Sequence, residues 1–335
     1  MTEVQNIEKV FSSFSDLKIG IVGDLMVDSY VWGNVDRISP EAPVPVVSVR
    51  KKEYRLGGAG NVAMNLQALG VNVQIVSVIG DDSMAGILQK LFHEKGIKSD
   101  YLLNSSSRIT TCKTRVISHN QQMIRLDEED THDLLPSEEE KLLENLFLYI
   151  KNENPGLIIF QDYNKGVLTQ KVISKAIDIC REKNVLTAVD PKKSNFFLYK
   201  HVTIFKPNFK EVKMALGITT ENADFESLKK MHHQLKERLD HQVSLITLSE
   251  KGIFYQSGED GNIIASHLRK IADVSGAGDT VVAVGSAVYA QTKNILLMAE
   301  IANIAGGLVC EEIGTAIIKK ESLLSEVKRL LKLKY

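Results

Sequence analysis

A glycine-rich turn ending in an aspartate, residues 273–280, has the composition of a site that handles a transferred phosphate. It reads Asp-Val-Ser-Gly-Ala-Gly-Asp-Thr, and the small, apolar, proline-free run that follows to Tyr289 favours a helix. A turn that opens a helix aims backbone N–H groups and the positive end of the helix dipole at one point, which stabilises an anion there. Asp279, in the first helical turn, is placed to take a proton from an attacking hydroxyl.

Two further properties of this turn follow from its place at a helix start. The helix dipole favours the charged form of Asp279, which predicts a weak base. The same eight residues are also consistent with a plain turn and an N-cap aspartate. The surrounding elements must therefore decide between the two interpretations.

Short apolar runs alternate with longer helical patterns along most of the chain. Nearly all-apolar strands are typical of parallel strands covered on both faces, so the alternation predicts an α/β fold with a doubly wound sheet. The strands are expected at 18–23, 71–79, 157–160, 185–189, 202–205 and 243–248, and the helices at 61–69, 84–95, 169–183, 209–216, 280–289, 295–311 and 321–331.

Polar residues recur where these strands end. Ligands of such sheets bind at the carboxyl ends of the strands, so this recurrence indicates a site. The residues concerned are Asp24, Asp28, Asp162, Asp190 and Asn208.

Two strand-like segments, approximately 30–56 and 110–127, have no helix to pair with. The second contains a candidate hairpin turn at Asn120–Gln122. We interpret both as a small β layer outside the main sheet that serves as a lid or a dimerisation surface. No repeat or linker divides the chain, so we expect one domain over residues 1–335.

Composition excludes several classes of protein. The chain has 335 residues, 44% of them hydrophobic and 25% charged, with a net charge of −1. This balance disfavours a nucleic-acid groove or a membrane surface as partner. The cysteines are odd in number and widely spaced, which disfavours a disulfide framework or a zinc site; they are Cys112, Cys180 and Cys310. With no signal-like N-terminus and no apolar stretch of about 20 residues, we expect a cytoplasmic globular protein.

A second glycine cluster, residues 57–61, offers a rival interpretation. From Gly58 it matches the dinucleotide-binding pattern G-x-G-x-x-A, and Asp81–Asp82 follows at the distance of a ribose-binding acid. However, residues 51–55 before it are charged, whereas a dinucleotide-binding strand is apolar up to its glycines. A Walker-A loop does not occur in the sequence.

The two glycine clusters, with Leu69–Gly70, resemble the two signatures of the ribokinase (PfkB) family of sugar kinases in order and separation. Residues 23–30, 37–46, 162–166 and 190–192 resemble more narrowly the branch of that family acting on D-glycero-β-D-manno-heptose 7-phosphate. The resemblance implies a ribokinase-like three-layer sandwich with a mostly parallel central sheet and a small β-sheet lid. It also implies ATP-dependent phosphorylation of the anomeric O1 to the 1,7-bisphosphate, for ADP-heptose and lipopolysaccharide synthesis.

The resemblance assigns roles on the phosphate side of the expected site. Asp279 would be the general base, and Gly276, Ala277 and Gly278 would form the anion hole. Asn208 and Glu211 would organise Mg²⁺ through water, although N-x-x-E at a helix start is also a capping box. A monovalent cation is a further possible activator. The ATP contacts would come from Asn208, Thr247, Ser249, Gly252, Gly278 and Asn303.

On the sugar side, the resemblance assigns Asp28, Gly58 and Asn61 to the hydroxyl groups. A substrate that already carries a phosphate also needs a cationic clamp. Taken singly, such charges are more typical of a solvated surface, except Lys165 and Lys192, which follow strand-end aspartates. His232–His233, in an expected polar helix, is also typical of a solvated surface. The candidates are Lys113, Arg115, Arg125, Lys165 and Lys192, with Asp190 beside the last.

Partners and alternatives complete these expectations. Relatives suggest a homodimer through the β lid, with a sugar phosphate as the small-molecule substrate. The cytidylyltransferase-like domain of the bifunctional form is not in this sequence, which implies a separate nucleotidyltransferase. The alternatives are a kinase for another sugar, such as fructose or ribose, and a non-catalytic sugar- or nucleotide-binding regulator.

Overall fold

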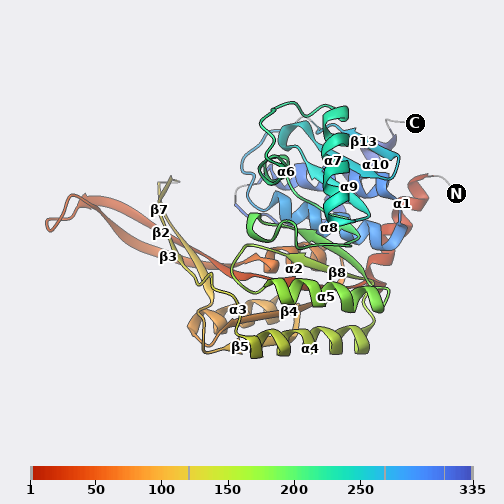
Figure 1. Ribbon diagram of the computed structural model, residues 1–335. Helices are drawn as coiled ribbons and strands as arrows, with labels where there is room; N and C mark the ends of the chain where they lie inside the picture. The colour runs from red at the N-terminus through yellow and green to blue at the C-terminus, as the bar shows by residue number, and fades with distance from the viewer. Residues whose placement is uncertain (1–2, 120, 268, 313, 333–335) are drawn as a thin grey trace.

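The computed structural model describes residues 3–119, 121–267, 269–312 and 314–332. Figure 1 shows a layered body with the helices packed around a large sheet, and an arm of β-strands that extends away from it. The α/β sandwich with a mostly parallel sheet and a small β sheet is therefore confirmed.

The large sheet has nine strands in the order β13-β12-β11-β10-β9-β8-β1-β4-β5. Its pairings are parallel from β5 to β11, and β12 and β13 add an antiparallel edge. The strands are β1 (Lys18–Gly23), β4 (Asn72–Gly80), β5 (Lys98–Ser105), β8 (Leu157–Gln161), β9 (Leu186–Asp190), β10 (Ile204–Phe205), β11 (Val243–Thr247), β12 (Ile253–Ser257) and β13 (Asp260–Ile264).

Two hydrophobic cores lie on opposite faces of this sheet because side chains alternate along each strand. On β8, Ile159 belongs to one core and Phe160 to the other. The first core is completed by α1 (Glu3–Ser12), α2 (Ala59–Ala68), α3 (Ser83–Glu94), α8 (Ala277–Thr292), α9 (Ile295–Val309) and α10 (Lys320–Lys332). The second is completed by α4 (Pro136–Glu153), α5 (Gln170–Glu182), α6 (Phe209–Leu216) and α7 (Phe225–Leu239).

The small sheet has the order β3-β2-β6-β7 and forms the arm. Its strands are β2 (Leu25–Ile38), β3 (Pro45–Gly58), β6 (Thr111–Ser118) and β7 (Gln121–Glu128). Strands β2 and β6 are parallel, and the two outer pairings are antiparallel. In the expected hairpin turn, Gln121 and Gln122 begin β7, whereas Asn120 lies outside the described residues.

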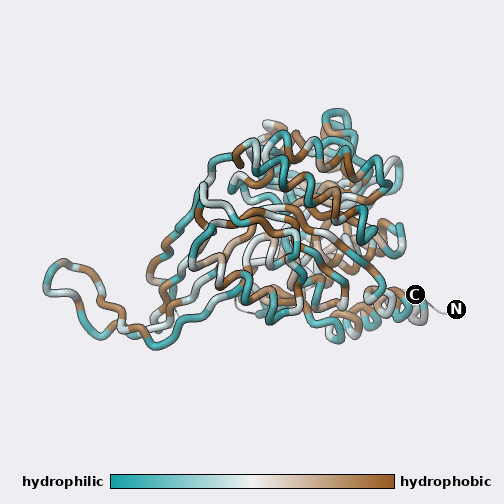
Figure 2. Tube along the Cα trace, turned by 90° about the horizontal axis from the view of Figure 1, so that it is seen from below, coloured by the Kyte–Doolittle hydropathy of each residue, from teal (hydrophilic) through white to brown (hydrophobic). Residues whose placement is uncertain are grey.

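The two faces of the small sheet differ in chemistry. Its register places Asp28, Arg55, Lys113 and Arg115 on one face. The opposite face carries apolar residues, including the exposed Val49, Ile124 and Leu126. In Figure 2 hydrophilic and hydrophobic residues alternate along the arm, as they must in strands with one charged and one apolar face.

Some elements lie outside those expected from sequence, namely α1, α4, β5 and the β12–β13 hairpin. The solvated position expected for His232 is wrong. Its side chain on α7 is 2% exposed, and it shares a hydrogen bond of 2.8 Å with the Ser244 hydroxyl. His241, fully buried, contacts the same hydroxyl at 2.6 Å. Among the described helices, none is long and apolar enough to cross a membrane.

Candidate active site

A cavity of about 550 Å³ opens where the carboxyl ends of β9 to β11 meet the N-terminus of α8. This volume is within the range of small-molecule sites. Most of the residues expected on the phosphate and nucleotide side line it, namely Asn208, Thr247, Ser249, Gly252, Gly276, Ala277, Gly278, Asp279 and Asn303. Two residues expected on the sugar side, Asp190 and Lys192, line it as well.

The start of α8 is shaped by glycine. Gly276 has a φ of 79°, and a Cβ there would lie 2.8 Å from Asn61 Nδ2, so a side chain is excluded on two grounds. At Gly278, the nearest atoms to a hypothetical Cβ would be Lys206 Nζ at 3.6 Å and Asp190 Oδ2 at 3.8 Å. The first turn of α8 therefore faces a lysine and a carboxylate from the strand ends.

Asp279 accepts three hydrogen bonds in a buried position. Asn61 Nδ2 donates to its Oδ2 at 2.7 Å. Gln161 Nε2 and the Tyr163 hydroxyl donate to its Oδ1 at 3.0 and 2.8 Å. The residue is only 5% exposed, so the carboxylate is held by neutral donors from α2 and from the end of β8.

The pKa of Asp279 is raised to about 6. Burial is the largest cause, and the negative charge of Asp190 adds to it, whereas hydrogen bonds from Asn61 and Tyr163 act in the opposite direction. The helix dipole led us to expect a weak base. Burial outweighs that effect, and Asp279 is a stronger base than its position in the helix suggests.

Of the residues expected to bind sugar hydroxyls, Asn61 lies beside Asp279, and Asp28 and Gly58 belong to the arm strands β2 and β3. Asn61 contacts Asp279 directly. Asp28, 4% exposed, accepts a hydrogen bond of 2.6 Å from Arg115 Nη1. Gly58 has a φ of 58°, and a Cβ there would lie 2.5 Å from the Asp24 carbonyl oxygen, so this position also requires glycine.

The position of Gly58 excludes the dinucleotide-binding interpretation. Gly58 ends β3, an antiparallel strand of the small sheet, rather than a parallel strand of the main sheet. A dinucleotide-binding turn follows a central parallel strand.

The candidate clamp residues fall into separate groups. Lys113 and Lys165 converge on Glu129, at 2.8 and 2.6 Å from its two carboxylate oxygens. Arg125 pairs with Asp127 two residues away on the same strand, and half of its side chain is exposed. Lys113 also lies 3.0 Å from Asp127. Two acceptors are therefore shared among these candidates, Glu129 by Lys113 and Lys165 and Asp127 by Lys113 and Arg125.

Lys192 lies away from that pair, on the nucleotide side. Its Nζ is 3.0 Å from Glu211 and 5.4 Å from the centre of the Tyr163 ring. The neighbouring carboxylates Asp190 and Glu211 raise the pKa of Lys192 despite its burial, so it remains charged. Asp190 is paired with Lys206 at 3.1 Å.

Asn208 and Glu211 form a complete capping box at the start of α6. The Asn208 side chain accepts from the Glu211 N–H, and the Glu211 carboxylate accepts from the Asn208 N–H, both at 2.8 Å. Within the described ranges no group of three or more His, Cys, Asp or Glu side chains could hold a metal ion. The Asn208 amide and the Glu211 carboxylate offer oxygen atoms, the kind of ligand that Mg²⁺ prefers.

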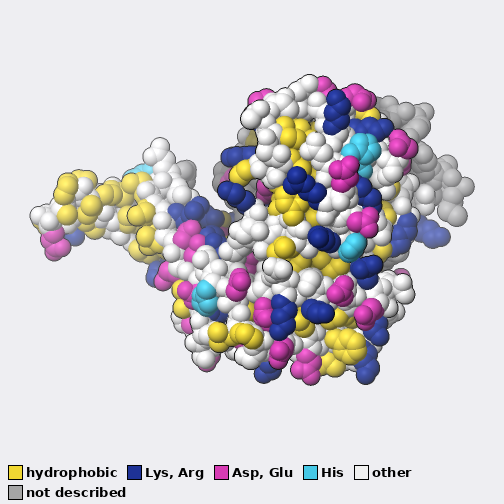
Figure 3. All heavy atoms as spheres, viewed as in Figure 1, with side chains coloured by type: hydrophobic (Ala, Val, Ile, Leu, Met, Phe, Trp, Pro, Cys, Tyr) yellow, Lys and Arg dark blue, Asp and Glu magenta, His cyan; other side chains and the backbone are white. Residues whose placement is uncertain are grey.

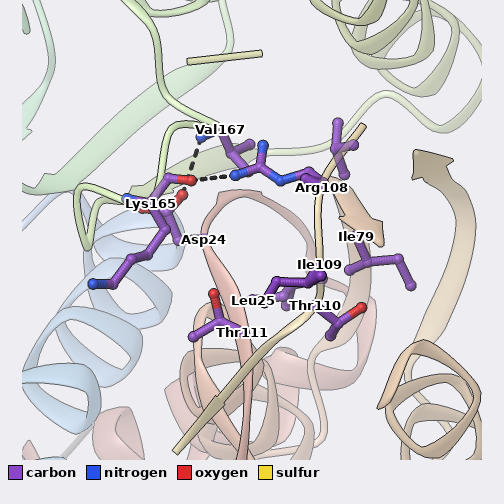
Figure 4. A pocket seen from close by; sticks show the side chains of 10 residues that line it. Asp24, Leu25, Ile79, Arg108, Ile109, Thr110, Thr111, Lys165 and Val167 are labelled. Atoms are coloured by element: carbon purple, nitrogen blue, oxygen red, sulfur yellow. Dashed lines mark hydrogen bonds between the residues drawn. The ribbon is translucent and has the colours of Figure 1, made fainter. Parts of the chain in front are cut away.

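A second, much smaller cavity of about 10 Å³ lies under the loop after β8 (Figure 4). That is space for about one water molecule. Asp24 accepts hydrogen bonds there from the backbone N–H groups of Tyr163, Lys165 and Val167 at 2.7 to 3.2 Å. Arg108 donates to the Lys165 carbonyl oxygen from the other side. These contacts fix the loop that carries Tyr163 and Lys165.

Sequence reasoning missed Gln161, Tyr163 and Lys206. For Gln161, the alternation of side chains along β8 could have predicted the face of the sheet on which it lies. Ile159 packs in the core on the α8 side, so Gln161, two residues on, faces α8. Asp162 faces the other layer, where it accepts a hydrogen bond of 2.6 Å from the Tyr199 hydroxyl.

Comparison with known proteins identifies the family. A model described as "pfkB family carbohydrate kinase" matches residues 16–322. The chain belongs to the PfkB family of carbohydrate kinases. It is accordingly a sugar kinase, and the resemblance noted in the sequence is confirmed.

Two curated relatives carry the name "Bifunctional protein HldE". The one from Geobacter sulfurreducens is 37% identical over 327 residues, which cover 97% of this chain and 66% of that protein. The one from Aliarcobacter butzleri is 42% identical over 298 residues, covering 88% of this chain and 61% of that protein. The chain thus spans a little less than two thirds of the length of these relatives.

Solved structures show the same fold. Phosphofructokinase-2 from Escherichia coli, in complex with potassium, matches with a TM-score of 0.78 at 16% identity, covering 94% of this chain and 99% of that one. Arabidopsis thaliana ribokinase, complexed with ribose and ATP, matches with a TM-score of 0.70 at 18% identity, covering 92% and 98%. The fold is therefore ribokinase-like.

Proposed function

We propose that this protein transfers the γ-phosphoryl group of ATP to the anomeric O1 of D-glycero-β-D-manno-heptose 7-phosphate. The product is the 1,7-bisphosphate, a precursor for ADP-heptose and lipopolysaccharide. One observation carries the proposal. The buried carboxylate of Asp279 lines a nucleotide-sized cavity and accepts a hydrogen bond from Asn61, on the helix that directly follows the arm strand β3. The similarity to the HldE proteins favours heptose over other sugars.

Asp279 acts as the general base in this proposal. The sugar hydroxyl gives its proton to the carboxylate as its oxygen bonds to the γ-phosphorus, and the bond from that phosphorus to the leaving ADP oxygen breaks. Such transfers have loose transition states, so the hydroxyl loses its proton late and a base with a pKa of about 6 suffices. Gly276, Ala277 and Gly278 supply the anion hole, since the backbone N–H groups and the positive dipole end at the start of α8 favour negative charge there.

The nucleotide occupies the cavity of about 550 Å³. Its adenine end lies toward Asn303, and Thr247, Ser249 and Gly252 border it from the end of β11. Asn208 and Glu211 hold the waters of Mg²⁺, which neutralises phosphate charge when bound. Lys192 and Lys206 add positive charge on the same side.

The heptose lies at the root of the arm, where the Asp28 carboxylate accepts hydrogen bonds from its hydroxyls and the Asn61 amide donates to them. Lys113 and Lys165 are the best-placed pair for the 7-phosphate. Glu129 now occupies the position of a bidentate anion between their ammonium groups, and a phosphate carries the same kind of acceptor oxygens. Arg115 lies on the same face and now pairs with Asp28.

The arm also supplies a surface for a second copy of the chain. Val49, Ile124 and Leu126 are each about half exposed on the apolar face of the small sheet. Figure 3 shows hydrophobic side chains gathered along the arm. An exposed apolar face of this kind is typical of an interaction surface. We propose that two arms pack face to face in a homodimer, each chain contributing one kinase domain over residues 1–335.

A substrate panel tests the proposal. ADP release with Mg·ATP is measured with heptose 7-phosphate, fructose 6-phosphate, fructose, ribose and no sugar. The proposal expects turnover with the heptose phosphate alone. Turnover with fructose or ribose instead would keep the kinase and overturn the substrate. ATP binding without turnover for any sugar would favour the non-catalytic regulator.

A further inference from the structure

We propose that Gln161 and Tyr163 are positioning residues that leave the Asp279 base one open acceptor site, on Oδ2 beside Asn61. This inference rests on the proposed role of Asp279 and goes beyond it, because it states which oxygen takes the proton and what holds the other. The starting observation is that both donors from the end of β8 meet the same oxygen, Oδ1, at 3.0 and 2.8 Å.

The number of lone pairs decides where a substrate can bind. An ionised carboxylate offers about four acceptor sites, two on each oxygen. Gln161 Nε2 and the Tyr163 hydroxyl fill both sites on Oδ1. Asn61 Nδ2 fills one site on Oδ2 at 2.7 Å. A reacting hydroxyl must therefore approach the second lone pair of Oδ2, the same oxygen that accepts the hydrogen bond from Asn61.

The two donors keep their roles throughout the reaction. Gln161 Nε2 donates to the carboxylates of Asp279 at 3.0 Å and Asp190 at 3.4 Å. Because only the amide nitrogen can donate to a carboxylate, these contacts fix the orientation of the amide. The Tyr163 hydroxyl is buried next to the charge of Asp279, which raises its pKa well above the ordinary value. Tyr163 consequently stays protonated and does not compete with Asp279 for the substrate proton.

The proton balance of the step follows from this arrangement. The hydroxyl O–H bond breaks and an Oδ2–H bond forms. The sugar oxygen forms a bond to the γ-phosphorus, and the bond from that phosphorus to the leaving ADP oxygen breaks. Oδ1 keeps both hydrogen bonds before and after transfer, so the carboxyl group does not rotate. A base held in one orientation lowers the entropic cost of reaching the reactive geometry.

The Asp279 carboxyl pKa is the readout, followed in the full-length protein by ¹³C NMR with carboxyl-labelled aspartate and assigned with Asp279→Asn. Tyr163→Phe removes one donor but keeps the ring that lies beneath Lys192 and lines the cavity. Loss of a hydrogen bond to the charged form should move the pKa upward by about one unit. The acidic limb of kcat against pH should move by the same amount, with the KM for ATP unchanged.

Tyr199→Phe is the matched control. Tyr199 is fully buried, and its hydroxyl likewise donates to a buried carboxylate, at 2.6 Å, but that carboxylate is Asp162 rather than Asp279. Its substitution should leave the Asp279 pKa in place. An unmoved Asp279 pKa in Tyr163→Phe, or an equal rise in both variants, would overturn the inference. Absence of turnover with every sugar would refute the proposed function separately, because the NMR titration does not depend on activity.

Discussion

The side-chain amide of Asn61 donates a hydrogen bond of 2.7 Å to the Asp279 carboxylate, across 218 positions of sequence. Asn61 belongs to α2, which begins directly after the arm strand β3, and Asp279 belongs to the first turn of α8. The contact thus links the root of the arm to the base in one buried network. A sugar held by the arm is in this way delivered to the residue proposed to deprotonate it.

The activity should fall on the acidic side with an apparent pKa near 6. Asp279 must be ionised to accept a proton, and burial raises its pKa to about 6. Turnover should accordingly be constant above that value and fall about tenfold for each pH unit below it. Initial rates at saturating substrates between pH 5 and 8 measure this. A limb centred near pH 4 would show that Asp279 is not buried as described.

Removing the paired lysines should weaken binding of the phosphorylated sugar without affecting ATP. Lys113→Met and Lys165→Met each leave one cation on the proposed phosphate, so the KM for the sugar phosphate should rise by about tenfold or more. Lys171→Met is the control, because this partly exposed lysine pairs with Glu139 and Glu140 rather than with Glu129, and it should leave the KM for the sugar phosphate unchanged. An unchanged KM in both Lys113→Met and Lys165→Met would place the clamp elsewhere, with Arg115 the next candidate.

Charges on the apolar face of the arm should separate the dimer. Ile124→Lys and Leu126→Lys put ammonium groups into the proposed contact, where they would be buried without partners. Light scattering after size exclusion should then report a monomer. Arg125→Gln is the matched control, because this residue lies between the two on the same strand and points to the opposite face. A dimer that survives both lysine variants would show that another surface forms it.

Stability should decline in mild acid because of two buried imidazoles. Burial lowers the pKa of His232 to about 4 and of His241 to about 3, from an ordinary value of 6.5. Below pH 6.5 these two histidines bind protons in the unfolded chain but not in the folded protein. Their contribution to stability is therefore complete above pH 6.5 and is lost as the pH falls toward 4 and below.

Urea denaturation at pH 7.5 and 5 measures this loss, which should be a few kcal/mol at most. His232→Gln should flatten the dependence, whereas His233→Gln, at an exposed position on the same helix, should not. Equal slopes for all three proteins would contradict the prediction.

The sequence was sufficient for the fold and for most of the cavity lining, because strand-end polar residues and the glycine turn are local signals. Two features depended on packing. The ionisation of Asp279 is set by burial under the end of β8, which the helix-dipole argument does not include. The convergence of Lys113 and Lys165 on Glu129 depends on the register of β6 with β7 and on the loop that Asp24 holds. Neither follows from the spacing of residues along the chain.

The most direct test of the account is the ³¹P NMR spectrum of a reaction of heptose 7-phosphate with Mg·ATP, for the wild type and for Asp279→Asn. The account predicts a new anomeric phosphate signal alongside the retained 7-phosphate, formed at a rate lower by about 10² to 10⁴ in the variant. Both proteins should bind ATP equally well. A phosphate on another oxygen, or a variant as active as the wild type, would contradict the central claim.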